Sequence, residues 1–473
     1  MEMVRMLSRR RGLVLTALTL SFAITGCKVT SNGDGDGDGD DGEGGGDNNA
    51  SVAPFFLPTG EPDNTSAPTV EVDSEGGIHA VYPAYAGGNA YYAYCAADCS
   101  GADDVAVVEL PTEGTTANAM IALDGNGRPQ VLLSTFSKVY YAAPNGDPTD
   151  AASWRMAIVL DHDSEKEVTG EAFALDSEGR PRFMMHTYVA YLGIGQDAPE
   201  THYVTCDSDC FDAASWHAYK VADQIWQSSK LQFGDDGSIH LATVASVADE
   251  NGLTTDIGAY VRCNGNCTAA ESWVGTGLMP AYSSEVEAVQ MRPAMTMDLT
   301  SDAKPRIAMI SDASGSKNLV YFECNGDCTD PNAWAGTILL DGSEIGPGVD
   351  LALDNEDRPR IAHTFNYNIG IAHCSTASCT AESSPWDVAT VEISSDMDPD
   401  EIFLWDNCNV AAWFLHTPSI ALDAGGNPRV GYQARDISGG WSNPDPNKPD
   451  CVAGTDMTWS RLAVMQNLLA GAL

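Results

Sequence analysis

Residues 351–362 read Leu-Ala-Leu-Asp-Asn-Glu-Asp-Arg-Pro-Arg-Ile-Ala, and this phrase decides the fold. It combines an apolar strand that ends in Leu-Asp, a short turn, and a Pro-Arg pair that opens a second apolar strand. The phrase recurs along the chain, and the residue that begins each turn serves as its anchor. The anchors are Asp73, Asp124, Asp176, Gly234, Thr300, Asp354 and Asp423. Seven copies of one unit indicate a repeat architecture.

Each copy continues with two more short alternating segments, such as residues 369–374 and the segment that Trp386 begins. Four strands joined by tight turns, without a helical period, predict a β-propeller blade. We therefore expect an all-β protein, a seven-bladed β-propeller of four-stranded antiparallel blades, over residues 51–473. The expected blades span residues 67–112, 115–161, 168–223, 228–280, 292–341, 348–394 and 416–466.

The strand–Asp–turn–strand order resembles the first hairpin of NHL-type blades, and the repeat pattern is also similar to that of sialidase-type propellers. The sialidase Asp box, Ser-x-Asp-x-Gly-x-Thr-Trp, is absent. The NHL resemblance implies that the first strand of each blade lines a central channel. Two residues before the anchor, Glu71, Gln232 and Asp298 replace the Ala of the other copies. These polar residues can hold an ion or a water cluster, or simply contact channel water.

The 13 cysteines fit hairpin disulfides better than zinc sites. The spacing C-x3-C encloses turn sequences, and the second copy has Pro144 and Pro148 where the fifth has Cys324 and Cys328. Proline can stiffen a turn but cannot ligate a metal. The expected disulfides are Cys95–Cys99, Cys206–Cys210, Cys263–Cys267, Cys324–Cys328, Cys374–Cys379 and Cys408–Cys451, and the last would tie an insertion to blade 7.

Tryptophan and arginine also recur at fixed places in the repeat. We expect the tryptophans to begin fourth strands and to pack between blades: Trp154, Trp216, Trp273, Trp334, Trp386 and Trp459. The arginines that follow the turns are expected to pair with neighbouring acids rather than to form a sialidase-like arginine triad: Arg182, Arg306, Arg360 and Arg429.

The N-terminal region predicts export. Residues 1–26 combine four arginines with an apolar stretch, as in a signal peptide, and residues 24–27 (Ile-Thr-Gly-Cys) resemble the bacterial lipobox. The resemblance implies cleavage before Cys27 and lipidation of that cysteine. Residues 27–50, rich in Gly and Asp, are expected to form a flexible acidic tether. We therefore expect an extracytoplasmic lipoprotein, anchored in the outer membrane or at the cell surface of a bacterium.

The net charge of −43 argues against nucleic acid as a partner. No apolar run is long enough to span a bilayer, so the lipid anchor would be the only membrane contact of the mature chain. The many acids either form a solvated acidic surface or include a site for Ca²⁺. We expect a monomer.

The sequence indicates a functional face rather than a functional site. Turns between second and third strands vary in length and composition. Turns between first and second strands and between third and fourth strands are short, and cysteine pairs are expected to close most of the latter. Aromatic and acidic residues mix in the variable loops, as in carbohydrate-binding proteins, although ordinary loop packing is the alternative for each one. The candidate ligand-binding residues are Tyr85, Tyr188, Tyr191, Asp312, Phe365, Tyr367, Asp436 and Trp441.

Three functions fit this pattern. The first is a tethered binding or adhesion module whose variable loops engage polysaccharide or a surface protein. The second is a glycan-active hydrolase or lyase, which the absence of every common catalytic motif disfavours. The third is a structural component of the cell envelope without a small ligand. No catalytic residue is assigned.

Overall fold

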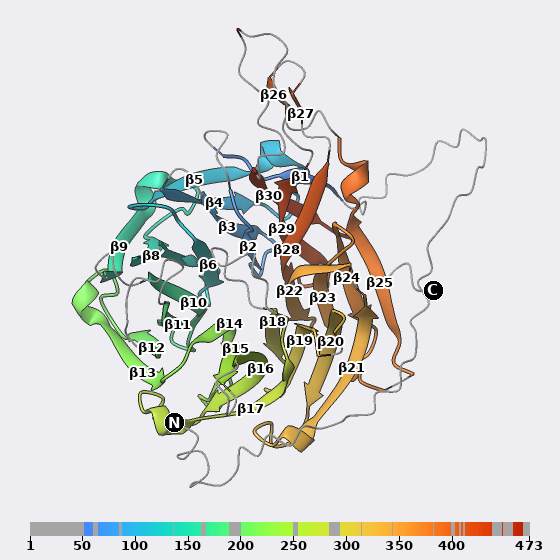
Figure 1. The fold of residues 1–473 in the computed structure, drawn as a ribbon. Coiled ribbons are helices and arrows are strands. Elements are labelled where there is room, and N and C mark those ends of the chain that lie inside the picture. The colour runs from blue at the N-terminus through green and yellow to red at the C-terminus, as the bar shows by residue number, and fades with distance from the viewer. Residues whose placement is uncertain are drawn as a thin grey trace, which may run out of the picture.

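The computed structural model describes residues 52–59, 65–84, 88–135, 137–161, 167–188, 200–248, 254–282, 294–313, 315–342, 344–381, 383–398, 403–405, 408–409, 412–437, 447 and 457–466. Seven four-stranded antiparallel sheets stand around a common axis, which confirms the predicted seven-bladed propeller (Figure 1). A further pair of short strands, β26 (Phe403–Trp405) and β27 (Cys408–Asn409), lies outside the ring.

The first three blades follow the chain from the inside outwards. Blade 1 contains β2 (Thr69–Val72), β3 (Ile78–Ala84), β4 (Asn89–Cys95) and β5 (Ala106–Pro111). Blade 2 contains β6 (Asn118–Leu123), β7 (Pro129–Ser134), β8 (Lys138–Pro144) and β9 (Trp154–Asp161). Blade 3 contains β10 (Glu167–Leu175), β11 (Pro181–Tyr188), β12 (Glu200–Cys206) and β13 (Trp216–Ala222).

The next three blades have the same order. Blade 4 contains β14 (Trp226–Phe233), β15 (Ile239–Ala248), β16 (Thr254–Cys263) and β17 (Trp273–Pro280). Blade 5 contains β18 (Met295–Leu299), β19 (Pro305–Ser311), β20 (Asn318–Cys324) and β21 (Trp334–Asp341). Blade 6 contains β22 (Ile345–Leu353), β23 (Pro359–Phe365), β24 (Asn368–Cys374) and β25 (Trp386–Glu392). Single 3-10 turns precede or follow outer strands: η1 (Ala102–Asp104), η2 (Ala151–Ser153), η3 (Ala213–Ser215), η4 (Ala270–Ser272), η6 (Pro331–Ala333) and η7 (Ser394–Asp396).

Blade 7 closes the ring with strands from both ends of the chain. It contains β28 (Trp413–Leu422), β29 (Pro428–Asp436), β30 (Thr458–Val464) and, as its outermost strand, β1 (Val52–Phe56). Trp459 therefore lies in the third strand, and the prediction that it begins a fourth strand was wrong. A repeat search along the sequence misses this because the N-terminal strand lies far from its partner in the chain. The Trp459 ring instead packs against Phe56 and Trp413.

The core of the molecule lies between the blades. Each of its main apolar clusters combines side chains from two neighbouring blades. The first strands of adjacent blades contact one another all the way around, from β2 through β6, β10, β14, β18 and β22 to β28. They therefore form the inner wall of the ring (Figure 1).

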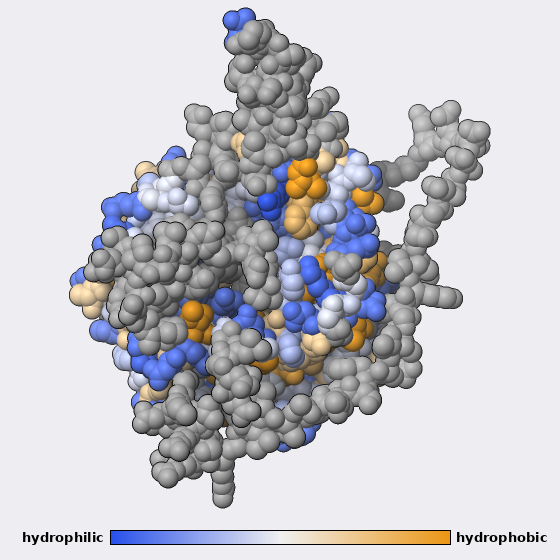
Figure 2. All heavy atoms as spheres, viewed as in Figure 1, coloured by the Kyte–Doolittle hydropathy of each residue, from blue (hydrophilic) through white to orange (hydrophobic). Residues whose placement is uncertain are grey.

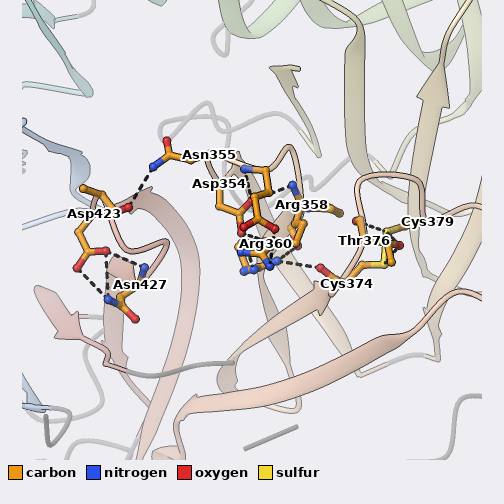
Figure 3. Close-up of polar contacts among 12 residues, drawn as sticks. Asp354, Asn355, Arg358, Arg360, Cys374, Thr376, Cys379, Asp423 and Asn427 are labelled. Atoms are coloured by element: carbon orange, nitrogen blue, oxygen red, sulfur yellow. Dashed lines mark hydrogen bonds and ion pairs between the residues drawn. A yellow bond between two sulfur atoms is a disulfide. The ribbon is translucent and has the colours of Figure 1, made fainter. Parts of the chain in front are cut away.

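Tight turns join the first and second strands, and an anchor aspartate shapes most of them. Asp354 Oδ1 accepts hydrogen bonds from the backbone N–H groups of Glu356 and Arg358, both at 3.0 Å (Figure 3). Asp73, Asp124, Asp176 and Asp423 accept the same pair of bonds. This Asx geometry explains why the Leu-Asp phrase predicts the turns.

Five of the six predicted disulfides, and all the predicted tryptophans except Trp459, agree with the structure. Five disulfides form, at Cys95–Cys99, Cys206–Cys210, Cys263–Cys267, Cys324–Cys328 and Cys374–Cys379. The indole N–H of Trp334 donates to the carbonyl of Cys328 at 2.9 Å, and Trp154 donates to Pro148, which stands in the cysteine position of blade 2. Five of these indoles also pack on a tyrosine of the preceding blade, with ring centroids 4.8–5.5 Å apart. They are blade-to-blade packing residues. Cys27 and Cys451 lie outside the described residues, so the predicted lipidation and the Cys408–Cys451 bridge stay predictions.

The recurrent arginines are structural as well. Arg360 is fully buried and donates to Asp354 Oδ2 at 2.8 Å and to the carbonyl of Cys374 at 3.0 Å (Figure 3). Arg182 and Arg429 also pair with the anchor aspartate of their own blade. Arg306, whose blade has Thr300 at the anchor, donates instead to Asn325 Oδ1 at 3.0 Å and to the carbonyl of Cys324 at 3.3 Å, so the prediction of an acidic partner was wrong for this arginine. All four arginines are occupied by contacts within their own blades.

Candidate functional site

The two ends of the ring differ in their loops. Turns between first and second strands share one face with the disulfide hairpins, and we call it the Asp-turn face. Turns between second and third strands, and the connections between blades, lie on the other face, which we call the variable face. Loops on a rigid scaffold are the usual place for binding residues. A binding site is therefore expected on the variable face or along the inner wall of the ring.

One aromatic side chain on the variable face is held outwards by a strained turn. Asn366 and Tyr367 form the two-residue turn between β23 and β24, with φ of +48° and +66°. Such turns favour Gly at left-handed positions, and a bulky residue there costs about 1–3 kcal/mol. Tyr367 nevertheless occupies it and is 51% exposed. Residues in strained left-handed conformations cluster at functional sites, which makes Tyr367 a candidate contact residue.

Neighbouring elements fix the position of this ring. The backbone N–H of Leu415 in β28 donates to the Tyr367 carbonyl at 3.0 Å, which pins the turn to blade 7. The Tyr367 ring meets Phe414 edge to face, with centroids 5.0 Å apart. Phe414 in turn lies 4.7 Å from the His416 ring. We call the pair Tyr367–Phe414 the aromatic step.

Acidic residues flank the aromatic step. The backbone N–H of Asn366 donates to the carbonyl of Glu344, so Glu344 lies beside the turn, and its side chain is exposed. On the other side, Asn368 Oδ1 accepts hydrogen bonds from the N–H and hydroxyl of Ser394, which begins η7. Asp396 ends η7 and is exposed. Two exposed acids therefore belong to the segments that contact the turn of the aromatic step.

A second group of polar residues lines the inner wall of the ring. Gln232 Nε2 donates to Asp298 Oδ1 at 2.6 Å, linking blades 4 and 5. Asp298 and Asp350 each also accept a backbone N–H from the next blade, Leu353 at 2.8 Å and Ile420 at 3.0 Å respectively. These two carboxylates therefore join the inner strands of blades 5, 6 and 7.

Glu71, on the inner strand of blade 1, interacts electrostatically with these carboxylates. Burial raises the pKa of Glu71 to about 7; Lys230 acts against this shift, whereas Asp350 and Asp298 add to it. Burial also raises the pKa of Asp298, while its hydrogen bond from Gln232 opposes the rise. We call Glu71, Lys230, Gln232, Asp298 and Asp350 the channel cluster. It contains a carboxyl group that titrates near neutral pH.

Two further buried histidines lie toward the variable end of the blades. His186 Nδ1 is 3.4 Å from Glu171 Oε2, and that carboxylate also accepts the backbone N–H of Ser228 in blade 4. His363 is 1% exposed, and burial lowers its pKa to about 4, so it is neutral. Gly370 lies against this imidazole, because a Cβ there would come within 2.9 Å of His363 Cε1. Both histidines are packed inside blades and do not reach the surface.

The candidate residues predicted from the sequence do not form one site. Tyr367 and Asp312 are exposed on the variable face, but Phe365 packs into the apolar cluster between blades 5 and 6, and Asp436 is fully buried. Tyr188 ends β11. The predicted residues outside the described part of the chain, in whole or in their side chains, are Tyr85, Tyr188, Tyr191 and Trp441.

Sequence reasoning missed Phe414, Glu344 and Asp396 and recognised only part of the channel cluster. Phe414 lies one residue from Trp413 in a long strand that carries no anchor signal at that end. The polar residues two before the anchor did predict Glu71, Gln232 and Asp298. Lys230 and Asp350 lie four residues before their anchors, so a search for polar residues at that position of the repeat would have found them too.

The described residues hold neither a metal centre nor a membrane span of the helical kind. Within the described ranges, no group of three or more His, Cys, Asp or Glu side chains is arranged to bind a metal ion. None of the helices described is long and apolar enough to cross a bilayer. On the face in view in Figure 2, hydrophobic residues form small separate patches among hydrophilic ones. Five disulfides are typical of a protein outside the cytoplasm.

Comparisons with known proteins identify no family. No family model matches the chain, and no curated protein matches it. Among solved structures, the chain is similar to the polysaccharide lyase Uly1, with 9% identity, a TM-score of 0.46, and coverage of 87% of this chain and 92% of that one. It is also similar to a PL25 ulvan lyase (12% identity, TM-score 0.43, coverage 68% and 78%). An α-L-arabinanase from Penicillium chrysogenum aligns with 10% identity and a TM-score of 0.44, covering 75% of this chain and all of that one. This level of similarity concerns the fold and says nothing about activity.

Proposed function

We propose that this chain binds polysaccharide on the variable face of its propeller, with the aromatic step as the central contact. The observation that carries the proposal is the exposed Tyr367 ring in a left-handed turn that favours glycine. Sugar rings have apolar faces that stack on aromatic side chains, while their hydroxyl groups bond to nearby carboxylates and amides. Tyr367, Phe414 and the flanking Glu344 and Asp396 supply both kinds of group.

The proposed setting is the outside of a cell. Removal of residues 1–26 and lipidation of Cys27 would leave the propeller on a flexible acidic tether, as an adhesion or capture module at a membrane surface. The five disulfides fit such an oxidising compartment. Metabolic labelling with a palmitate analogue, lost in Cys27→Ala, tests the anchor.

A second candidate function is glycan cleavage, by a hydrolase or lyase. Polysaccharide lyases and an arabinanase are among the proteins whose structures are similar. One observation in this chain favours it: the pKa of Glu71 is about 7, so this carboxyl can give and take a proton at neutral pH. Release of oligosaccharides by the purified chain, abolished in Glu71→Gln, would support cleavage. Binding without release would support the capture function alone.

A glycan array with the purified chain tests the binding proposal. Saturable binding that is lost in Tyr367→Gly would support the aromatic step. Glycine suits the left-handed turn, so the variant keeps the fold while losing the ring. Val274→Ala is the matched control, because Val274 is equally exposed, at 52%, but lies in the outer strand of blade 4. Equal binding by all three proteins would refute the assignment.

A further inference from the structure

The aromatic step belongs to a strongly acidic chain. The chain carries 67 Asp and Glu against 24 Lys and Arg. Two exposed acids belong to the segments that contact the turn that presents Tyr367: Glu344, whose carbonyl accepts the Asn366 N–H, and Asp396, two residues after Ser394, which bonds to Asn368. A ligand lying on the Tyr367 ring therefore enters a negative potential.

The described lysines of the variable face do not offset this potential. Lys138 pairs with the carboxylates of Glu113 and Asp161. Lys220 pairs with Glu200 at 2.7 Å and with Asp223 at 2.5 Å. Each lysine is neutralised by two acids, which leaves it poorly suited to bind a uronate or a sulfate.

Two other cations on this face have partners too. Lys317 Nζ stands 4.2 Å from the centre of the Tyr282 ring, in a cation–π contact. Arg435 is the cross-strand partner of Phe414, is half-buried, and has interactions of its own. Arg435 is therefore already engaged, and the exposed charged residues that the described segments bring to the turn are Glu344 and Asp396.

From this charge complementarity we propose that the aromatic step selects a cationic glycan, one that contains amino sugars with free amines, over neutral and anionic glycans. This inference rests on the proposed polysaccharide binding and names the ligand class. The ring face of the amino sugar stacks on Tyr367, and its ammonium group lies between Glu344 and Asp396. A glycan carrying uronate or sulfate groups is repelled by the same carboxylates.

A set of three hexasaccharides tests the proposal because they share β-linked pyranose rings but differ in charge. The probes are a glucosamine hexamer, its fully N-acetylated counterpart and a glucuronate-containing hexamer, titrated calorimetrically into the purified chain at mildly acidic pH. One ion pair at close range in water is worth roughly fivefold in affinity, which corresponds to about 1 kcal/mol. We expect the glucosamine hexamer to bind about 5–25-fold more tightly than the acetylated hexamer, and the uronate to bind most weakly.

Charge variants locate the effect. Glu344→Gln combined with Asp396→Asn should remove the preference for the glucosamine hexamer while the acetylated hexamer binds as before. The control changes net charge equally on the Asp-turn face, where Glu75 and Asp235 are exposed: Glu75→Gln combined with Asp235→Asn should keep the preference. Raising the salt concentration should lower the preference as well.

The outcomes separate the two proposals. Binding of the acetylated hexamer with no gain for the glucosamine hexamer, or tighter binding of the uronate, would overturn the charge preference and leave polysaccharide binding intact. A preference that both double variants keep would overturn the assignment to Glu344 and Asp396. Failure of all three hexamers and of the glycan array would overturn the proposed function and, with it, this inference.

Discussion

The salt bridge between Arg461 and Glu392 should be the most sensitive polar contact in the ring closure. Arg461 Nε and Nη2 donate to the Glu392 carboxylate at 2.9 and 2.6 Å, and the Tyr432 hydroxyl donates to it at 2.6 Å. Arg461 also donates to the carbonyl of Pro54 at 2.9 Å and covers the Phe56 ring at 4.2 Å. One guanidinium therefore joins the outer strand of blade 6 to β30 and to the N-terminal strand β1.

Removing one partner leaves the other charge buried. The side chains of Arg461 and Glu392 are 2% and 10% exposed. Breaking a buried pair of this kind typically costs about 3–5 kcal/mol, whereas replacing both partners by apolar residues costs far less. We therefore expect Glu392→Ala to lower the free energy of unfolding by about 3–5 kcal/mol, and Arg461→Met combined with Glu392→Leu to cost less than the single change.

Equilibrium unfolding in urea, followed by tryptophan fluorescence, measures both variants, and Glu356→Ala is the control. Glu356 also pairs with an arginine, Arg358, but is 71% exposed, so its loss should cost less than about 1 kcal/mol. A cost for Glu392→Ala as small as that of the control would refute the reasoning.

Three further predictions follow from other contacts. Trp334→Phe keeps most of the ring packing but loses the 2.9 Å hydrogen bond to Cys328, so the free energy of unfolding should fall by about 0.5–1.5 kcal/mol, measured by thermal unfolding. Wild-type stability in Trp334→Phe would show that this hydrogen bond does not contribute. Ala303 has φ +58° at the turn position where most other copies have glycine, so Ala303→Gly should raise the free energy of unfolding by about 1 kcal/mol. The control Ala335→Gly, in the extended strand β21, should lower it. A change of the same sign in both variants would contradict this reasoning. Because the pKa of Glu71 rises from 4.5 to about 7 on folding, the folded state binds an extra proton between these pH values. The free energy of unfolding should therefore fall as the pH rises from 4.5 to 7, and Glu71→Gln should flatten this dependence. A pH profile of the free energy of unfolding that Glu71→Gln leaves unchanged would count against the channel cluster.

Much of the fold could be predicted from the sequence because its signals are local. An anchor aspartate closes a turn through the backbone N–H groups two and four residues after it, and cysteine pairs four or five residues apart can only join the ends of one hairpin. Such contacts involve neighbouring residues, so repeats of sequence become repeats of structure. The ring closure is different, since β1 and its partner β30 lie near opposite ends of the chain, and β1 belongs to no repeat.

The candidate site was harder to predict because it depends on contacts between blades. Tyr367 could be recognised as a loop aromatic, but its exposure and its contact with Phe414 come from the way blade 7 sits beside blade 6. Asp436 and Phe365 have the same residue types as a sugar site, yet Asp436 is fully buried and Phe365 packs, partly buried, against the cluster between blades 5 and 6. Residue type and loop position therefore indicate a face, and only the packing of neighbouring blades selects the residues on it.

The most direct test of the binding proposal is the affinity of the chain for the best glycan from the array, measured by calorimetry for the wild type, Tyr367→Gly and Val274→Ala. We predict that Tyr367→Gly lowers the affinity at least tenfold, that Val274→Ala leaves it unchanged, and that all three proteins unfold at similar temperatures. Wild-type affinity in Tyr367→Gly would contradict the central claim, because the exposed ring in its strained turn would then have no part in binding.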